Sequence, residues 1–188
     1  MPSLNTMIAL MFAVIVSTIA AIYLIVKLGQ TKGRTTDRVV KFATLAIFVS
    51  YVATLFIVTV VARDKRPDQT PRFIPFFDVY FIIANKYPWY VDDLLLLDAI
   101  NAALFVPYGL LACETLNRKS IVLPLCSGVA LSLVIEVVQL ISDRGIFDVN
   151  DIIYNTLGTF IGCGVYVLLK KLWYRILSKR TQSSEDIK

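Results

Sequence analysis

The sequence predicts an all-α integral membrane protein, a bundle of about five transmembrane helices with its N-terminus outside and its C-terminus in the cytoplasm. Of its 188 residues, 57% are hydrophobic and only 18% are charged, whereas soluble domains are roughly 45–50% apolar and about 25% charged. Five apolar runs reach the roughly 20 residues that a helix needs to cross a bilayer. We expect one membrane domain over residues 1–180 and a short disordered tail over 181–188.

The predicted spans cover residues 7–26, 42–62, 94–113, 121–141 and 152–173. The first run has no basic residue before it and no small-residue cleavage site after it, which favours a span over a signal peptide. The long connection over residues 63–93 contains an aromatic segment, residues 73–83, that is too short to cross the bilayer. We predict that this segment lies in the outer interface or re-enters the membrane.

The distribution of basic residues orients the bundle. Thirteen of the 19 Lys and Arg residues lie in the first and third connections or near and beyond the end of the fifth span, and six lie on the opposite side. The positive-inside rule therefore places the C-terminus in the cytoplasm. The net charge of +5 follows from these topological charges, so we expect a multi-pass protein of the cell membrane with no nucleic-acid partner.

Polar side chains occur at a similar depth in three predicted spans. The third span carries Asp98 and Asn101, the fourth Glu136 and Gln139, and the fifth Asn155. A charged group at the centre of a membrane helix costs about 2.5–3.5 kcal/mol, so these side chains should face one another rather than lipid. We predict one polar cluster near the outer ends of the three spans.

A second pattern leads into the fifth span, where polar and small residues recur every three or four positions: Arg144, Asp148, Asp151, Asn155, Gly158 and Gly162. They form one stripe if the helix begins by Arg144, although Asp148 could instead cap the helix. Arg144 could pair with Asp148 or with Glu136. The two glycines allow close approach of a neighbour, for which the fourth span is the obvious candidate, and the same face could join two copies of the chain.

The residue types limit the chemistry. The chain has no histidine, and its three cysteines lie in apolar runs, so a disulfide framework or a zinc cluster is not expected. We predict no dedicated metal site and no cofactor, although carboxylates could hold a divalent cation. Acid–base chemistry would have to use Glu136, Asp148 and Asp151, which makes them the candidate catalytic residues if the protein is an enzyme.

Ser132, Glu136, Gln139 and the stripe that follows, in this order and spacing, resemble the signature of the VanZ-like family. The resemblance extends to Asn101-x3-Phe105-x-Pro107-x-Gly109-Leu110-Leu111 and to Ile74-Pro75-Phe76 after Arg72, and it covers about residues 63–165. Position 73, usually Asn in that family, is Phe. The family comprises small multi-pass bacterial membrane proteins and is named after an accessory protein associated with low-level teicoplanin resistance. The resemblance therefore implies a link to glycopeptide resistance, and Pro107 and Gly109 are expected to pack.

Three functions remain open at this stage. The polar cluster could bind or modulate an anionic lipid or lipid-linked cell-wall precursor at the outer leaflet. The ligand-binding candidates are Arg144, Gln139, Asn155, Asn101, Asp98 and Arg72. Alternatively, the three carboxylates could act on a lipid-linked substrate inside the membrane. A lipid flippase is less favoured, because the inner halves of spans three to five are almost wholly apolar.

Overall fold

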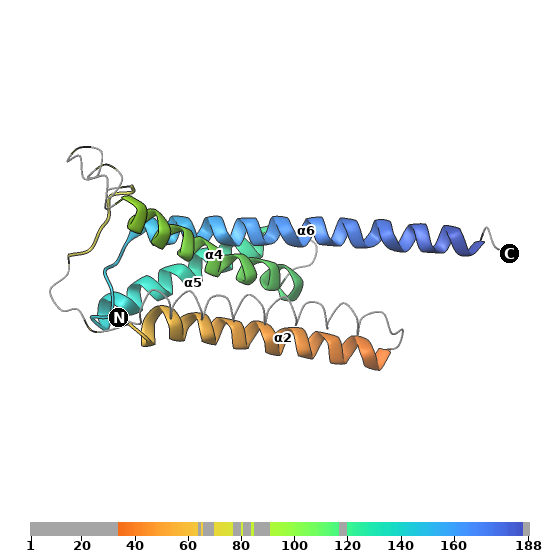
Figure 1. Ribbon diagram of the computed structural model, residues 1–188. Coiled ribbons are helices and arrows are strands. Elements are labelled where there is room, and N and C mark those ends of the chain that lie inside the picture. The colour runs from red at the N-terminus through yellow and green to blue at the C-terminus, as the bar shows by residue number, and fades with distance from the viewer. Residues whose placement is uncertain are drawn as a thin grey trace.

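The computed structural model describes residues 34–63, 65, 70–76, 80, 84, 91–116 and 120–185. Helix α2 (Arg34–Phe56) continues into one π-helical turn, η1 (Ile57–Val61), and is followed by α4 (Val91–Thr115), α5 (Val122–Ile141) and α6 (Val149–Glu185). These helices form an elongated bundle (Figure 1). Within the described ranges no strand forms, and Arg72 and Asp148 make only an isolated parallel bridge. The all-helical prediction is confirmed for this part of the chain.

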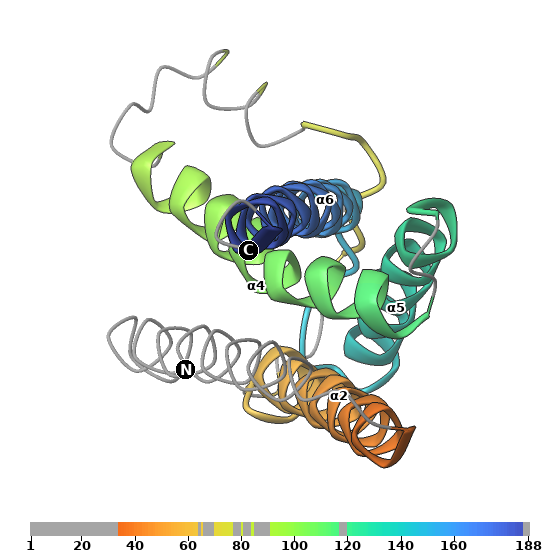
Figure 2. The ribbon, with the colours of Figure 1, turned by 90° about the vertical axis from the view of Figure 1, so that its right-hand side faces the viewer.

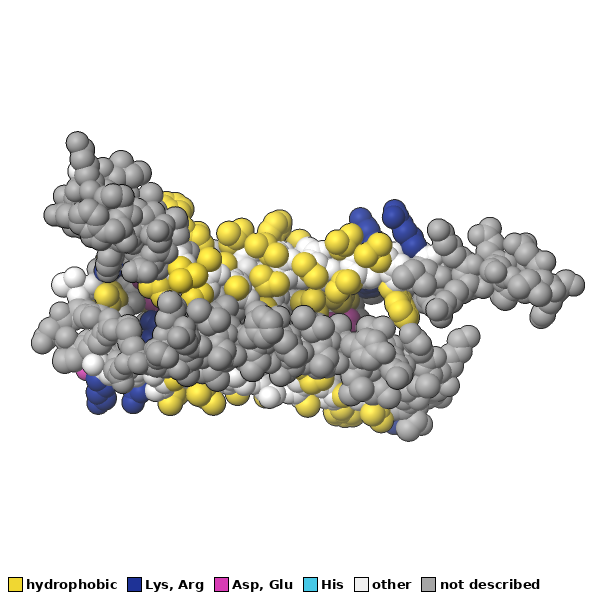
Figure 3. Space-filling view, viewed as in Figure 1, with side chains coloured by type: hydrophobic (Ala, Val, Ile, Leu, Met, Phe, Trp, Pro, Cys, Tyr) yellow, Lys and Arg dark blue, Asp and Glu magenta, His cyan; other side chains and the backbone are white. Residues whose placement is uncertain are grey.

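Four helical stretches are long and apolar enough to cross a membrane: Arg38–Val61, Leu96–Thr115, Val122–Ile141 and Val149–Trp173. They correspond to the second to fifth predicted spans, whereas the first, over residues 7–26, lies outside the described residues. Where grey atoms do not cover the face seen in Figure 3, hydrophobic side chains occupy the middle of the bundle, and Lys and Arg side chains lie nearer its ends. This distribution is typical of a membrane protein, whose lipid-facing surface is apolar.

Among the described helices, α4 and α6 share the most extensive contact (Figures 1 and 2). A Cβ atom at Gly158 would lie 2.0 Å from the carbonyl oxygen of Ala102, and one at Gly162 would lie 2.0 Å from that of Val106. The two backbones therefore touch, and the glycines pack against the third predicted span rather than the fourth. Because α4 covers this face, self-association through it would require α4 and α6 to separate.

Thr159 marks the place where α4, α5 and α6 meet. A Cβ atom at Gly109 of α4 would lie 2.2 Å from the Thr159 carbonyl oxygen, and one at Gly128 of α5 would lie 2.5 Å from the Thr159 hydroxyl. Pro107 is buried inside α4, two residues before Gly109. The expected packing roles of Pro107 and Gly109 agree with these positions.

An apolar core lies mainly between α2 and α4, with one contribution from α5. Its buried members are Tyr51, Leu55, Val60, Ile100, Leu104, Phe105, Tyr108, Leu111, Ala112 and Ile135. The Tyr51 hydroxyl donates to the Leu104 carbonyl oxygen at 2.5 Å, which satisfies the one polar group that this tyrosine brings into the core. The bundle is thus held by apolar burial on one side of α4 and by backbone contact with α6 on the other.

Helix α6 differs from the prediction at both ends. It begins at Val149, so Arg144 and Asp148 precede it and the predicted stripe is not one helical face. It continues to Glu185, so residues 181–185 are helical although a disordered tail was expected there. Towards that end the Tyr166 hydroxyl donates to Glu114, just beyond the third predicted span, at 3.0 Å, which joins α4 to α6 a second time.

Candidate functional site

The turn after α5 reverses the chain toward α6. The backbone N–H of Arg144 donates to the Gln139 carbonyl at 3.0 Å and that of Asp143 to the Leu140 carbonyl at 3.4 Å, which is the Schellman pattern of a helix C-terminus. Asp143 takes the left-handed conformation that this motif requires, with φ 55°. Aspartate adopts this conformation more readily than most non-glycine residues. The turn thereby fixes the direction of Arg144.

Arg144 caps the π-helical turn η1. Its Nη1 atom donates to the carbonyl oxygens of Val61 at 2.6 Å and Arg63 at 2.9 Å. A cation is favourable there because the last carbonyl groups of a helix lack intrahelical partners. The predicted partners of Arg144, Asp148 and Glu136, are therefore wrong, and the side chain ties the end of α2–η1 to the α5–α6 turn.

Gln139 makes a second tie to the same turn of helix. Its buried Nε2 atom donates to the Thr59 carbonyl at 2.9 Å. Its Oε1 atom has no hydrogen-bond partner among the described residues and is directed at Gly145, where a Cβ atom would approach it to 2.8 Å. Gln139 and Arg144 thus hold η1 in place and lie outside the main group of acidic side chains.

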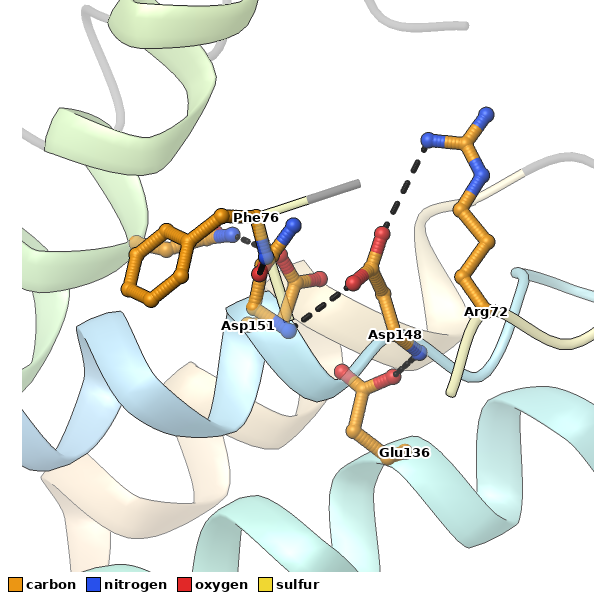
Figure 4. Close-up of polar contacts among 7 residues, drawn as sticks. Arg72, Phe76, Glu136, Asp148 and Asp151 are labelled. Carbon is orange, nitrogen blue, oxygen red and sulfur yellow. Dashed lines mark hydrogen bonds and ion pairs between the residues drawn. The ribbon is translucent and has the colours of Figure 1, made fainter. Parts of the chain in front are cut away.

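Glu136, Asp148 and Asp151 are brought together at the start of α6 (Figure 4). Glu136 is only 1% exposed, and its Oε2 atom accepts a hydrogen bond from the Asp148 backbone N–H at 2.9 Å. The Asp148 Oδ1 atom accepts from the Asn150 N–H at 2.8 Å, so Asp148 is the N-cap of α6. Its other oxygen lies 3.7 Å from Nη1 of Arg72. The predicted capping role of Asp148 is confirmed.

One further hydrogen bond completes this group, and two charged residues act on it. The Asp151 Oδ1 atom accepts from Nδ2 of Asn101 at 2.6 Å, which joins α6 to α4. Asp98 acts electrostatically on Asp151, and the positive charge of Arg63 acts on both Asp151 and Glu136. We call the set of Arg72, Asn101, Glu136, Asp148, Asn150 and Asp151 the acidic network.

A loop from the long α2–α4 connection joins the acidic network through its backbone. Arg72 donates its N–H to the Phe147 carbonyl at 2.8 Å and accepts from the Val149 N–H at 3.1 Å. The Phe76 N–H donates to Oδ1 of buried Asn150 at 2.7 Å. Phe76 has φ 57°, a conformation that bulky residues rarely adopt, and the hydrogen bond that its N–H donates to Asn150 helps to hold it. Asn150 is not among the site residues that the sequence predicts.

The side chains of this loop face outward. Phe73, Ile74, Phe76 and Tyr80 are each between 49% and 71% exposed. Exposed apolar side chains beside a polar cluster are typical of a binding or membrane-contacting surface. The predicted interfacial placement of residues 73–83 stays a prediction, since only part of this segment is described.

Asn155 lies one turn below Asp151 and does not join the acidic network. Its Nδ2 atom donates to the Ser132 hydroxyl at 2.9 Å, and both residues are buried. This hydrogen bond joins α5 to α6 inside the bundle, where an unsatisfied amide would be costly. Its partner Ser132 lies one turn before Glu136 on α5, within the pattern that carries the family resemblance.

The acidic network could act chemically in two ways, by holding a charged head group or by transferring protons between carboxyl groups. Among the described residues, no three Asp, Glu or Cys side chains are arranged to hold a metal ion. Binding of a divalent cation through Asp148 therefore remains an untested prediction. The geometry favours a role in which charges are fixed in place by hydrogen bonds from three helices and one loop.

The fold and this site define a helical-bundle membrane protein with a buried acidic network at one end. The chain belongs to the VanZ/LLP1 family, whose model matches residues 42–170. Over 71 residues it is 34% identical to Protein VanZ of Enterococcus faecium, a match that covers 38% of this chain and 44% of that relative. The match thus spans less than half of the length of this curated relative. No solved structure matches the chain.

Proposed function

We propose that this protein binds the anionic head group of a lipid or lipid-linked cell-wall precursor at the outer leaflet of the cell membrane, and that this binding links it to resistance against glycopeptides such as teicoplanin. The observation that carries the proposal is the placement of Arg72. Its side chain is 37% exposed, yet it is oriented by Asp148, whose side chain is 14% exposed. A fixed cation at the end of a membrane bundle suits a phosphate or diphosphate group.

The chemistry of arginine supports this ligand class. The guanidinium group is planar and can donate two parallel hydrogen bonds to a phosphate. The Arg72 backbone is held by two hydrogen bonds to the start of α6, so little conformational freedom is lost on binding. Exposed Phe73 and Ile74 follow it directly and offer an apolar surface to the lipid chain of the same ligand.

The link to resistance rests on the family. The relative from Enterococcus faecium carries the name VanZ, and the sequence resemblance associates that name with teicoplanin. A protein that occupies lipid-linked precursors at the outer leaflet would reduce their access to a membrane-anchored glycopeptide. In this proposal the other residues of the acidic network hold Arg72 in its orientation.

The test compares binding and resistance in the same variants. Purified protein is titrated with vesicles that contain a polyprenyl diphosphate, and the wild type is expected to bind them more tightly than phosphatidylcholine vesicles. Arg72→Gln should weaken this binding about 10-fold or more, because a hydrogen bond to a charged group contributes about 1.5–3 kcal/mol. In a susceptible Gram-positive host, wild type should protect against teicoplanin more than vancomycin, and Arg72→Gln should lose that protection at a matched membrane level.

Asp148→Asn and Gly164→Ala serve as comparison variants. Asparagine can still cap α6 but cannot form an ion pair with Arg72, so binding should weaken in the same direction. Gly164 has nothing within 4 Å of the Cβ position, so its substitution should leave binding unchanged. Equal binding by wild type and Arg72→Gln would contradict the proposal.

An intramembrane enzyme is the second candidate, and the burial of Glu136 favours it. A carboxyl group removed from water, next to Asp148 and Asp151, is a suitable proton carrier. Glu136→Gln separates the two functions, because the amide oxygen can still accept from the Asp148 N–H but the side chain cannot transfer a proton. Retained protection supports binding, and loss of protection with normal protein level and unchanged vesicle binding supports catalysis.

We further propose five spans, with the N-terminus and the acidic network outside, the C-terminus in the cytoplasm, and the aromatic segment over residues 73–83 in the outer interface. The distribution of Lys and Arg supports this orientation. A reporter that is active only outside the cell should be inactive when fused after residue 188, and a cysteine introduced at exposed position 65 should react with a membrane-impermeant maleimide in intact cells, in a Cys126→Ser background. The reverse pattern would overturn the orientation.

A further inference from the structure

Two of the three cysteines meet at the interface between α4 and α6. The Sγ atoms of Cys113 and Cys163 are 2.8 Å apart, and each residue is 1% exposed. Both are free thiols in the structure, as is exposed Cys126. The sequence places all three cysteines in apolar runs. Their spacing gives no sign that Cys113, near the end of α4, meets Cys163, in the middle of α6.

We propose that Cys113 and Cys163 form an oxidisable pair, a modification site at which a peroxide converts two thiols into a disulfide that joins α4 to α6. A disulfide bond measures about 2.05 Å, so the sulfurs need to move together by less than about 1 Å. A metal ion between them fits poorly, because a single Zn–S bond already measures about 2.3 Å. This inference does not depend on the ligand of the acidic network.

The oxidation balances in two steps. One thiol sulfur attacks an oxygen of hydrogen peroxide: an S–O bond forms, the O–O bond breaks, and the S–H proton passes to the leaving hydroxide, so that water is released and a sulfenic acid remains. The sulfur of the second thiol then attacks the sulfenic sulfur: the S–S bond forms, the S–O bond breaks, and the second S–H proton leaves with the hydroxide as water. Two thiols are oxidised, one peroxide is reduced, and two waters are produced. A small neutral peroxide suits this buried pair, which a protein oxidant cannot reach.

The position of the pair gives the bond a structural consequence. Cys163 lies 12 residues beyond Asp151 on α6, about 18 Å along the helix. The same two helices hold the Asn101–Asp151 hydrogen bond at the other end of their contact. A covalent bond at Cys113–Cys163 would therefore limit any separation of α4 from α6 and keep one side of the acidic network closed.

The test uses the full chain in lipid nanodiscs, treated with hydrogen peroxide, quenched with acid, denatured and alkylated with maleimide. Wild type and Cys126→Ser are expected to lose alkylation at Cys113 and Cys163 and to yield one cross-linked peptide from α4 and α6, which a membrane-permeant phosphine reverses. Cys163→Ser should give no such peptide. The proposal is overturned if Cys113 and Cys163 are still alkylated at a dose that fully oxidises exposed Cys126, or if Cys113 links to Cys126 instead.

Discussion

Gly162→Ala is expected to lose most of its folded population on mild heating. The added methyl group would lie 2.0 Å from the Val106 carbonyl oxygen and 2.9 Å from the Leu110 nitrogen, and these backbone atoms cannot rotate away. Overpacking of a rigid site typically costs about 1–3 kcal/mol and occasionally more. Since α4 and α6 must separate to admit the methyl group, we expect a loss of at least about 3 kcal/mol.

Gly164→Ala is the matched control on the same helix. It is the same substitution two positions away, at an exposed residue with open space around its Cβ position. Alanine is favoured over glycine in a helix by about 1 kcal/mol, so this variant should match or exceed the wild type. Elution of detergent-solubilised protein as a single peak after stepwise heating measures both. Similar melting temperatures for the two variants would mean that α4 and α6 do not touch at Gly162.

Glu136→Ala is expected to destabilise the protein by about 2–4 kcal/mol. The substitution leaves the Asp148 backbone N–H without its acceptor and opens a cavity at a side chain that is 1% exposed. Both effects act at the start of α6, so the loop that carries Arg72 should loosen with it. Hydrogen exchange at residues 147–151 is expected to accelerate at least about tenfold.

Glu136→Gln is the companion variant for this measurement. Glutamine has nearly the same shape and retains an oxygen that can accept from the Asp148 N–H, but it can neither ionise nor transfer a proton. We expect its melting temperature and its hydrogen exchange to stay close to those of the wild type. If Glu136→Gln is as unstable as Glu136→Ala, the charge of Glu136, and not its hydrogen bond, holds the start of α6.

The positions of the helices and the convergence of Asn101, Glu136 and Asp151 could be predicted from the sequence. Apolar length alone identifies a membrane-spanning segment, and the cost of a polar group facing lipid forces such groups inward. These two constraints were sufficient to place these two carboxylates and one amide in one region. They do not specify which atoms pair, since several donors lie within reach at similar depth.

The partners of Arg144 and Gln139 could not be predicted, because both side chains bind backbone carbonyl oxygens. Every residue carries a carbonyl group, so a sequence gives no sign of which ones are unpaired. Here the π-helical turn η1 exposes them, and such turns have no reliable sequence signature. Asn150 was missed for a related reason, since its partner is the backbone N–H of Phe76.

The helix that packs against Gly158 and Gly162 was predicted wrongly. The spacing of the two glycines shows which face of their helix lacks side chains, but it does not show which helix packs on that face. Sequence proximity favoured the fourth predicted span. In the bundle, α4 and α6 run in the same direction and bring Ala102 and Val106 to the two glycines. Similarly, Asp148 is an N-cap, so the helix starts after the position that the stripe required.

Helix α6 has 37 residues and is about 55 Å long, whereas the hydrocarbon core of a bilayer is about 30 Å thick. Its apolar part ends at Trp173, which leaves 12 helical residues to Glu185, about 18 Å of helix beyond that apolar part. A domain or reporter fused directly after Glu185 would therefore be separated from the apolar part of α6 by about three further turns of helix.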